Sequence, residues 1–327
     1  MEFTITGANA LTYPHLHIWD WRVAIYLFLG GLAGGCMSMA AVANLRPGKD
    51  VPKNQACCWR VPMMTPIILA VGMGFLFLDL QVKQHMYRFY MTLQPLSPMS
   101  WGSWILVLVF PAMIAFALST VPESAMDKLK DGMIRNLIIK AQNSMRPLAK
   151  LNFLLGILLS IYTGILLSSF MARPLWNSSI LPVLFLNSGM STGAATMILM
   201  ARRSSIKLFF TKVDIWLIFS EITVLILLYY GQFTSPEASR ESIMPFFTLT
   251  SQYFPYFISI LTLSIVLPLA IILKFLELSG DHSENLELTF KQKFEMNASA
   301  VLVLLGGAII RFALVYAGQL SKFTGLS

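Results

Sequence analysis

Apolar residues in this sequence are grouped into eight long runs that are separated by shorter polar segments. The runs cover residues 20–45, 61–80, 101–121, 151–171, 178–201, 213–231, 253–275 and 296–320. Each run is close to the ~20 residues that a helix needs to cross roughly 30 Å of hydrocarbon. The runs are continuous and rich in Leu, Ile and Met, whereas a transmembrane barrel shows short segments of alternating polarity. The pattern therefore predicts eight transmembrane helices.

Composition supports a membrane protein. Hydrophobic residues make up 56% of the 327 and charged residues only 12%, with a mean hydropathy of +0.67, which is outside the usual mixture of a soluble domain. Residues 1–16 lack a basic start and an apolar centre, so no cleavable signal peptide is expected. We expect an all-α polytopic membrane protein with a single integral membrane domain over residues 1–327.

Lys and Arg residues are divided unequally between the two sides of the expected bundle. The segments after the first, third, fifth and seventh runs hold 17 of the 24, the other side holds 6, and Arg311 lies within a run. Positively charged loops stay in the cytoplasm, so both termini are expected in the periplasm of a bacterium, with the chain in the inner membrane. Topology and anionic lipid account for the net charge of +8, and no nucleic-acid partner is expected.

Two segments half a chain apart are similar to each other. They read "LFLGGLAGG" from Leu27 and "LFLNSGMSTG" from Leu184, and both are expected to run from outside to inside. Duplicated halves, residues 19–171 and 178–320, would form two four-helix bundles. Chance similarity between membrane sequences is the alternative.

Ionisable side chains within hydrocarbon are costly and mark candidate functional residues. Glu221 lies in the middle of the sixth run, Arg311 lies in the outer part of the eighth, and Asp79 lies at the outer end of the second. At a rise of about 1.5 Å per residue, Asp79 and Arg311 lie within roughly 6 Å in depth, and Glu221 lies on the order of 8 Å deeper. Arg311 can therefore pair with either carboxylate. Such a pair either fixes helix register or controls a carboxylate that accepts a proton.

Aromatic and polar residues gather at the outer end of the runs. They are Trp19, Trp21, Tyr26, Trp101, Trp104, Trp176 and Gln319, with Asn187 and Tyr162 deeper. A single Trp or Tyr at this depth is typically an interface anchor, but here the group lies with four ionisable residues, Asp20, Asp79, His85 and Arg311. In the first run, Gly30 with Gly34 and Gly31 with Gly35 form two GxxxG pairs, which allow a neighbouring backbone or a flat ligand to approach closely.

The histidines and cysteines do not predict a metal centre. His15, His17, His85 and His282 lie at run ends or in loops, which disfavours a transmembrane b-type haem. Cys36, Cys57 and Cys58 are too few to hold an iron–sulfur cluster. P-loop and HExxH motifs are also missing from the sequence. Any electrons handled by this protein are therefore expected to pass to another protein.

Three segments resemble the NrfD/PsrC family of membrane subunits. They are "WDWRVAIYLFLGGLAGG" from Trp19, "YTGILLSSFMARPLWNSSILPVLFLNSGMSTGAA" from Tyr162 and "RFALVYAGQL" from Arg311. Within the family they are most similar to the NrfD branch of formate-dependent nitrite reduction. The resemblance implies eight or nine helices without haem, and a quinone bound near the periplasmic face. It also implies electron exchange with a ferredoxin-like iron–sulfur subunit, which serves a molybdopterin oxidoreductase or a multihaem cytochrome.

The resemblance also implies roles for individual residues. It places the quinone pocket near Tyr26 and Tyr162, with Asp79, Glu221 and Arg311 as candidate catalytic residues that handle protons. His85, Asn187 and Trp21 are further candidate quinone-binding residues because they belong to the polar and aromatic group at the outer end. In the polysulfide reductase branch, polar residues including a His occupy the part of the first helix that faces the quinone. Val23 and Tyr26 fall there in this sequence, so we expect different contacts, with the Tyr26 hydroxyl as a donor.

The leading hypothesis is a subunit that oxidises menaquinol near the periplasmic face. A proton or ion transporter without redox chemistry is the first alternative. Few polar groups, among them Thr211, Asp214 and Asn297, lie in the inner half of the runs, which disfavours it. A purely structural membrane anchor is the second alternative.

Overall fold

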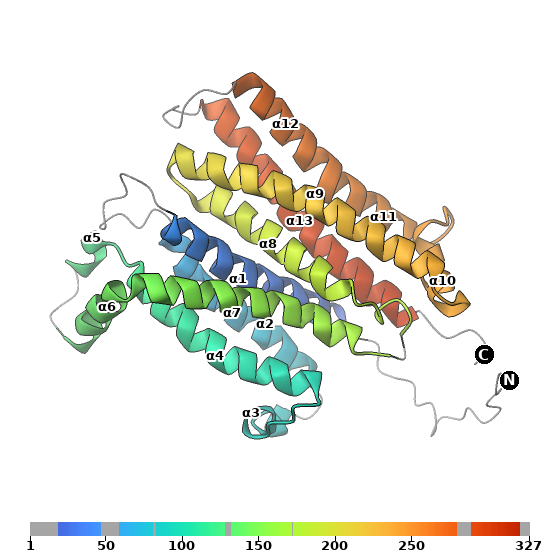
Figure 1. The fold of residues 1–327 in the computed structure, drawn as a ribbon, viewed down its shortest axis with the longest axis horizontal. Helices are drawn as coiled ribbons and strands as arrows, with labels where there is room; N and C mark the ends of the chain where they lie inside the picture. Colours follow the sequence, from blue (N-terminus) through green and yellow to red (C-terminus); the bar gives the residue numbers. More distant parts are fainter. Residues whose placement is uncertain are drawn as a thin grey trace.

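The computed structural model describes residues 19–46, 59–80, 83–127, 132–171, 173–279 and 289–320. All regular elements within these ranges are helical (Figure 1). Eight helices of this described part are long and apolar enough to cross a membrane, which confirms an all-α polytopic protein with eight spans. His15, His17, Cys57, Cys58 and His282 lie outside the described residues.

The first four spans are α1 (Trp21–Leu45), α2 (Arg60–Asp79), α4 (Pro98–Ser119) and α7 (Met145–Ser168). The next two are α8 (Leu181–Met200) and α9 (Ser204–Thr234). The seventh span, Phe254–Lys274, consists of α11 (Phe254–Ser259), the π-helix η3 (Ile260–Val266) and the start of α12 (Leu267–Ser279). The eighth is α13 (Phe290–Leu320).

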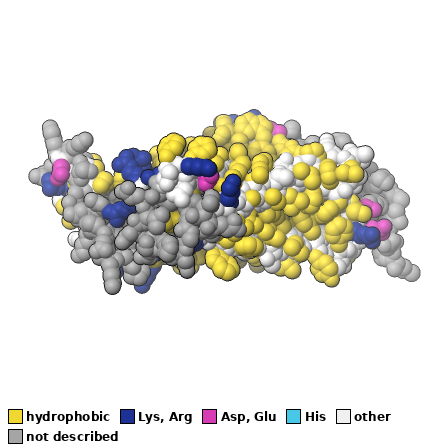
Figure 2. Space-filling model, turned by 90° about the horizontal axis from the view of Figure 1, so that it is seen from above, with side chains coloured by type: hydrophobic (Ala, Val, Ile, Leu, Met, Phe, Trp, Pro, Cys, Tyr) yellow, Lys and Arg dark blue, Asp and Glu magenta, His cyan; other side chains and the backbone are white. Residues whose placement is uncertain are grey.

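Short helices connect the spans at both ends. They are η1 (Lys83–His85), α3 (Arg88–Met91), α5 (Glu123–Met126), α6 (Met133–Asn143), α10 (Glu237–Ile243) and η2 (Met244–Phe246). We call the end at which α1 begins the Trp21 end and the opposite one the Leu45 end. Figure 2 shows hydrophobic side chains over the middle of the molecule and Lys and Arg side chains gathered toward the Leu45 end. This distribution agrees with the charge pattern of the loops, and a periplasmic Trp21 end stays a prediction.

The helix α1 packs against spans from both halves of the sequence. One core cluster is built only from α1, α2, α4 and α7, and includes Met37, Leu69, Met113 and Leu159. Among the later spans, α8 packs against α9 and α13, and α13 packs against η3 and α12. Because α1 also packs against α7, α8 and α13, it lies at the centre of the molecule.

Glycines let α1 approach its neighbours at backbone distance. A Cβ added to Gly35 would collide with the carbonyl group of Gly189 and the Cα atom of Gly193, both in α8. A Cβ added to Gly34 would collide with the carbonyl oxygen of Gly156 in α7. Two helices with glycines at four-residue spacing can meet in this way. The two similar sequence segments therefore pack directly against each other, and these glycines serve helix packing.

Substitution of Gly35 by alanine is expected to destabilise the bundle. The added methyl group meets main-chain atoms, which cannot rotate away, so ~1–3 kcal/mol or more should be lost. Gly74→Ala is the matched control, because nothing lies within 4 Å of a Cβ at Gly74 in the described part of the protein. Thermal unfolding in detergent measures both. Equal transition temperatures for the two variants would contradict the packing described for α1 and α8.

Candidate functional site

Arg311 is completely buried, with 0% of its surface exposed. Its Nη1 atom donates hydrogen bonds to Ser188 Oγ at 2.9 Å and to the Gly307 carbonyl oxygen at 2.8 Å, and Nη2 donates to the Phe185 carbonyl oxygen at 3.5 Å. The guanidinium carbon lies 5.2 Å from the centre of the Phe185 ring. A charge removed from water needs compensation from such acceptors, rings and counter-charges.

Gly31 of α1 creates space that the guanidinium occupies. A Cβ on Gly31 would lie 2.6 Å from Arg311 Nη2. Gly307 of α13 lets α8 approach beside the guanidinium, because a Cβ there would lie 2.6 Å from Thr192 Cγ2. The GxxxG pairs of the first span therefore provide both helix packing and room for a buried cation.

Glu221 faces Arg311 from α9 and is 2% exposed. Its carboxylate interacts electrostatically with Arg311 and also interacts with Ser188. Ser264 of η3 donates a hydrogen bond to Glu221 Oε2 at 3.4 Å, and Oε1 has no hydrogen-bond partner among the described residues. We call Ser188, Glu221, Ser264 and Arg311 the arginine–carboxylate cluster. Of the two carboxylates that depth alone left open to Arg311, the structure brings Glu221 to it.

Asp214 is a second buried carboxylate that the sequence reasoning did not select as a site residue. It is 0% exposed, and its Oδ1 atom accepts a hydrogen bond from Ser191 Oγ at 2.7 Å, while Oδ2 has no partner within the described ranges. It interacts electrostatically with Glu221. Seven residues are about two helical turns, so the two carboxylates share one face of α9. That spacing is the sequence signal that could have identified Asp214.

The buried face of α9 continues toward the Leu45 end with further polar groups. Thr211 is 1% exposed and Lys207 is 6% exposed. Lys207 Nζ donates a hydrogen bond to Asn297 Oδ1 of α13 at 2.6 Å. Lys207, Thr211 and Asp214 therefore form a buried polar stretch along one face of α9.

Tyr26 of α1 and Tyr162 of α7 lie together toward the Trp21 end. They are 4% and 5% exposed and lie near each other, and Tyr90 of α3 also lies near Tyr26. The Tyr162 ring packs directly against Gly102 of α4, where it leaves no room for a side chain. We call Tyr26, Tyr90 and Tyr162 the tyrosine cluster. Since Tyr26 and Gly31 belong to the same helix, α1 contributes to both clusters.

The other predicted site residues lie apart from these clusters. Asp79 is partly buried at the end of α2, and its charged neighbours are Asp20 and Arg22. His85 is exposed in η1. Trp21 is 46% exposed and packs edge-on against Phe75, with ring centres 5.6 Å apart. Asn187 Nδ2 donates to the Leu217 carbonyl oxygen at 2.9 Å, which ties α8 to α9 about one turn from Glu221.

Trp176 lies inside the protein and is only 3% exposed, so it is not an interface anchor. Its Nε1 atom donates to the Leu314 carbonyl oxygen at 2.8 Å, about one turn from Arg311. Its ring stacks on Trp19 at 5.2 Å and meets Phe170 edge-on at 5.7 Å. Gln319 Nε2 donates to the Trp19 carbonyl oxygen at 3.0 Å. We call Trp19, Phe170 and Trp176 the aromatic clasp, which joins α1 and the α7–α8 connection to α13.

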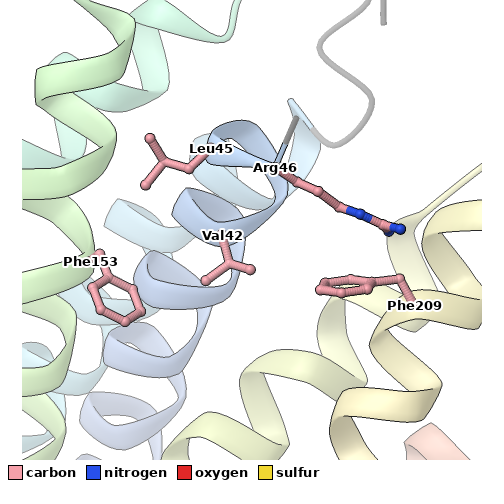
Figure 3. Close-up of a pocket in the computed structure, with 5 residues that line it drawn as sticks. All are labelled: Val42, Leu45, Arg46, Phe153 and Phe209. Atoms are coloured by element: carbon pink, nitrogen blue, oxygen red, sulfur yellow. The ribbon is translucent and has the colours of Figure 1, made fainter. Parts of the chain in front are cut away.

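Two apolar hollows open on the surface of the described part of the protein. The larger, of about 380 Å³, lies on α2 toward the Trp21 end and is lined by Val71, Gly74, Phe75, Phe77 and Leu78. The other, of about 320 Å³, lies at the Leu45 end (Figure 3) and is lined by Val42, Leu45, Arg46, Phe153 and Phe209. There the Arg46 guanidinium lies over the Phe209 ring, 4.2 Å from its centre. Neither hollow is lined by Tyr26, Tyr162 or Arg311.

Eight spans that enclose a buried arginine, buried carboxylates and a tyrosine cluster define a polytopic helical membrane protein with an intramembrane polar site. The sequence matches the family described as "Polysulphide reductase, NrfD" over residues 10–322, and the protein belongs to this family. Family members include membrane subunits of reductase complexes.

Relatives with known names agree with this assignment. The sequence is 27% identical to the C component of the polysulfide reductase of Wolinella succinogenes over 314 residues, which cover 92% of this protein and 94% of the relative. It is 26% identical to a protein NrfD homolog of Haemophilus influenzae over a region that covers 94% of this protein and 96% of the relative. It is also 27% identical to the C component of the tetrathionate reductase of Salmonella typhimurium over a region that covers 64% of this protein and 56% of the relative.

Proposed function

We propose that this protein is the quinone-reactive subunit of a respiratory reductase complex in the bacterial inner membrane. It oxidises menaquinol near the periplasmic face and passes the electrons to a ferredoxin-like iron–sulfur subunit. That subunit serves a molybdopterin oxidoreductase or a multihaem cytochrome. The observation that carries the proposal is the pair of buried tyrosines Tyr26 and Tyr162 toward the Trp21 end, in a member of this family whose α1 also packs against a buried arginine beside a carboxylate.

The tyrosine cluster supplies the contacts that a quinol headgroup needs. Each of the hydroxyls of Tyr26 and Tyr162 can donate a hydrogen bond to a quinol oxygen or accept one from it. The hollow on α2 provides an apolar approach from the lipid toward α1, against which α2 packs. Because Tyr26 and Tyr162 are buried and line neither hollow, binding of a ring between them requires neighbouring side chains to move.

The arginine–carboxylate cluster handles the protons in this proposal. Oxidation of one quinol releases two electrons and two protons, and the electrons leave to the partner subunit. Glu221 has an Oε1 atom without a hydrogen bond in the described structure, which can bind a proton, and Arg311 holds the carboxylate in place by electrostatic attraction. Asp214 lies two turns before Glu221 on α9, and its Oδ2 atom also has no hydrogen bond in the described structure. It provides a second proton-binding position.

Tyr162→Phe tests this proposal in the assembled complex. Loss of the hydroxyl should lower quinol-dependent reductase activity about tenfold, because a lost hydrogen bond of about 1.4 kcal/mol corresponds to that factor. Activity with an artificial electron donor that reduces the partner directly should not change. Tyr230→Phe is the control, since Tyr230 is 67% exposed on α9. An equal loss of both activities would indicate a structural anchor, and an unchanged quinol-dependent activity would exclude Tyr162 from the site.

Proton conduction without redox chemistry is the second candidate function. It is favoured by the polar face of α9, where Lys207, Thr211, Asp214 and Glu221 are all buried. This candidate predicts proton flux through liposomes that contain the full-length protein without partner subunits or quinol. The quinol-oxidising subunit predicts no such flux.

A further inference from the structure

The seventh span contains seven consecutive residues of π-helix, Ile260–Val266, between α11 and α12. Such a geometry is rare and is found frequently at functional sites. Its buried residues are Ile260, Ser264 and Ile265. Ser264 is the polar member, is 2% exposed, and is the residue of this span that hydrogen-bonds Glu221. The irregular segment and the candidate site therefore coincide.

The π-helix is held against α13 by a glycine. A Cβ on Gly306 would lie 2.5 Å from both Cα and Cβ of Ser264. The next residue, Gly307, faces the other way, where a Cβ would lie 2.6 Å from Thr192 and 3.5 Å from Ser188 Oγ. The adjacent glycines thus let η3 and α8 close on α13 from two sides. Their serines, Ser264 and Ser188, both interact with Glu221.

The π geometry determines where the Ser264 hydroxyl points. A hydrogen bond that spans five residues accommodates one residue more than the α-helical bond, and one residue corresponds to about 100° around a helix axis. Continuation of α11 as a regular α-helix would therefore rotate Ser264 away from Glu221. Ser259, at the end of α11, is partly exposed and donates to the Pro255 carbonyl oxygen of its own helix at 2.7 Å.

We propose that Ser264 is a positioning residue for Glu221, and that the π-helix places the Ser264 hydroxyl within hydrogen-bond distance of the Glu221 carboxylate. The hydrogen bond fixes the orientation of Glu221 between Ser188 and Arg311, and leaves Oε1 available for a proton. The charged groups that interact with Glu221 are Arg311 of α13 and Asp214 of α9, whereas α8 and η3 present serines. The positioning of Glu221 by Ser264 is independent of the proposed function. Only the transfer of a proton by Glu221 rests on the proposed oxidation of quinol.

Infrared spectroscopy of the full-length protein in its complex tests the positioning role without quinol. Glu221→Gln identifies the carboxyl bands of Glu221 by difference. Ser264→Ala should shift these bands because the hydrogen bond is lost, while Ser264→Thr, which keeps the hydroxyl, should retain them. Ser259→Ala is the matched control and should change nothing. Glu221 bands that are identical in Ser264→Ala and the unmodified protein would overturn the proposal.

Gly306→Ala tests the π-helix itself. The new methyl group displaces η3 from α13 while Ser264 stays in the sequence, so the Glu221 bands should shift as in Ser264→Ala. Unshifted bands in a folded Gly306→Ala variant would overturn the role of the π-helix. Quinol-dependent activity is then measured against pH. A band shift in Ser264→Ala with an unchanged pH profile would support the positioning role and count against proton transfer by Glu221. Failure of the positioning role and failure of the proposed function therefore give different results.

Discussion

Substitution of Arg311 by methionine is expected to abolish quinol-dependent activity and to destabilise the protein by about 3–5 kcal/mol. Methionine fills much of the same space, but Glu221 then loses its arginine counter-charge, and Ser188 Oγ and the Gly307 carbonyl oxygen lose their donor. Thermal unfolding in detergent and the quinol-dependent reductase assay measure the two effects. Unfolding at the temperature of the unmodified protein would contradict the electrostatic role of Arg311.

The double variant Arg311→Met with Glu221→Gln separates stability from function. Replacement of two buried opposite charges together by neutral residues is often tolerated, whereas removal of one charge leaves the other uncompensated and is strongly destabilising. The double variant should therefore recover most of the lost stability. If the pair takes part in proton transfer, quinol-dependent activity stays abolished. Recovered activity would show that the pair only fixes the register of α9 and α13.

Trp176→Ala is expected to have the largest effect on stability outside the arginine–carboxylate cluster, with a loss of ~3–5 kcal/mol. The substitution leaves a cavity against Gly318, which the indole now covers. It also removes the stacking on Trp19 and the hydrogen bond to the Leu314 carbonyl oxygen. The transition temperature of thermal unfolding should fall accordingly.

Trp104→Ala is the matched control for the aromatic clasp. Trp104 lies at the Trp21 end of α4 and is 38% exposed, so its removal deletes less buried surface and the transition temperature should fall less. A similar fall for both variants would mean that Trp176 is no more than another interface anchor. The other tryptophans at this end, Trp21 and Trp101, are about half exposed and fit the anchoring role that is typical of tryptophan at this depth.

The sequence predicted the spans well because eight runs of apolar residues are a direct consequence of the bilayer. Helix ends were harder to predict. The helix α9 begins at Ser204 and α13 at Phe290, several residues before the apolar runs at 213 and 296. These extensions contain Lys207, Lys212 and Lys293. A run of apolar residues stops at such charges, whereas a helix can continue past the hydrocarbon.

The sequence predicted how deep the candidate site residues lie in the membrane, but not how each helix is rotated about its axis. Counting residues placed Asp79 and Glu221 within reach of Arg311, but which carboxylate faces the guanidinium depends on how α9 and α13 rotate and pack. The π-helix of the seventh span is hidden for a related reason. The segment Ile260–Val266 has only two polar residues, Thr262 and Ser264, and so short a pattern does not distinguish a π-turn from an α-turn.

The central place of α1 has a consequence for biogenesis. The helix α1 leaves the ribosome before its partners α8 and α13, and the hydrogen bond from Gln319 to Trp19 joins residues 300 positions apart. Gly34 and Gly35 are covered once α7 and α8 have been made, but the space beside Gly31 is filled only when α13 brings Arg311 to it. A nascent polypeptide arrested before α13 therefore leaves this part of α1 without its partner helix.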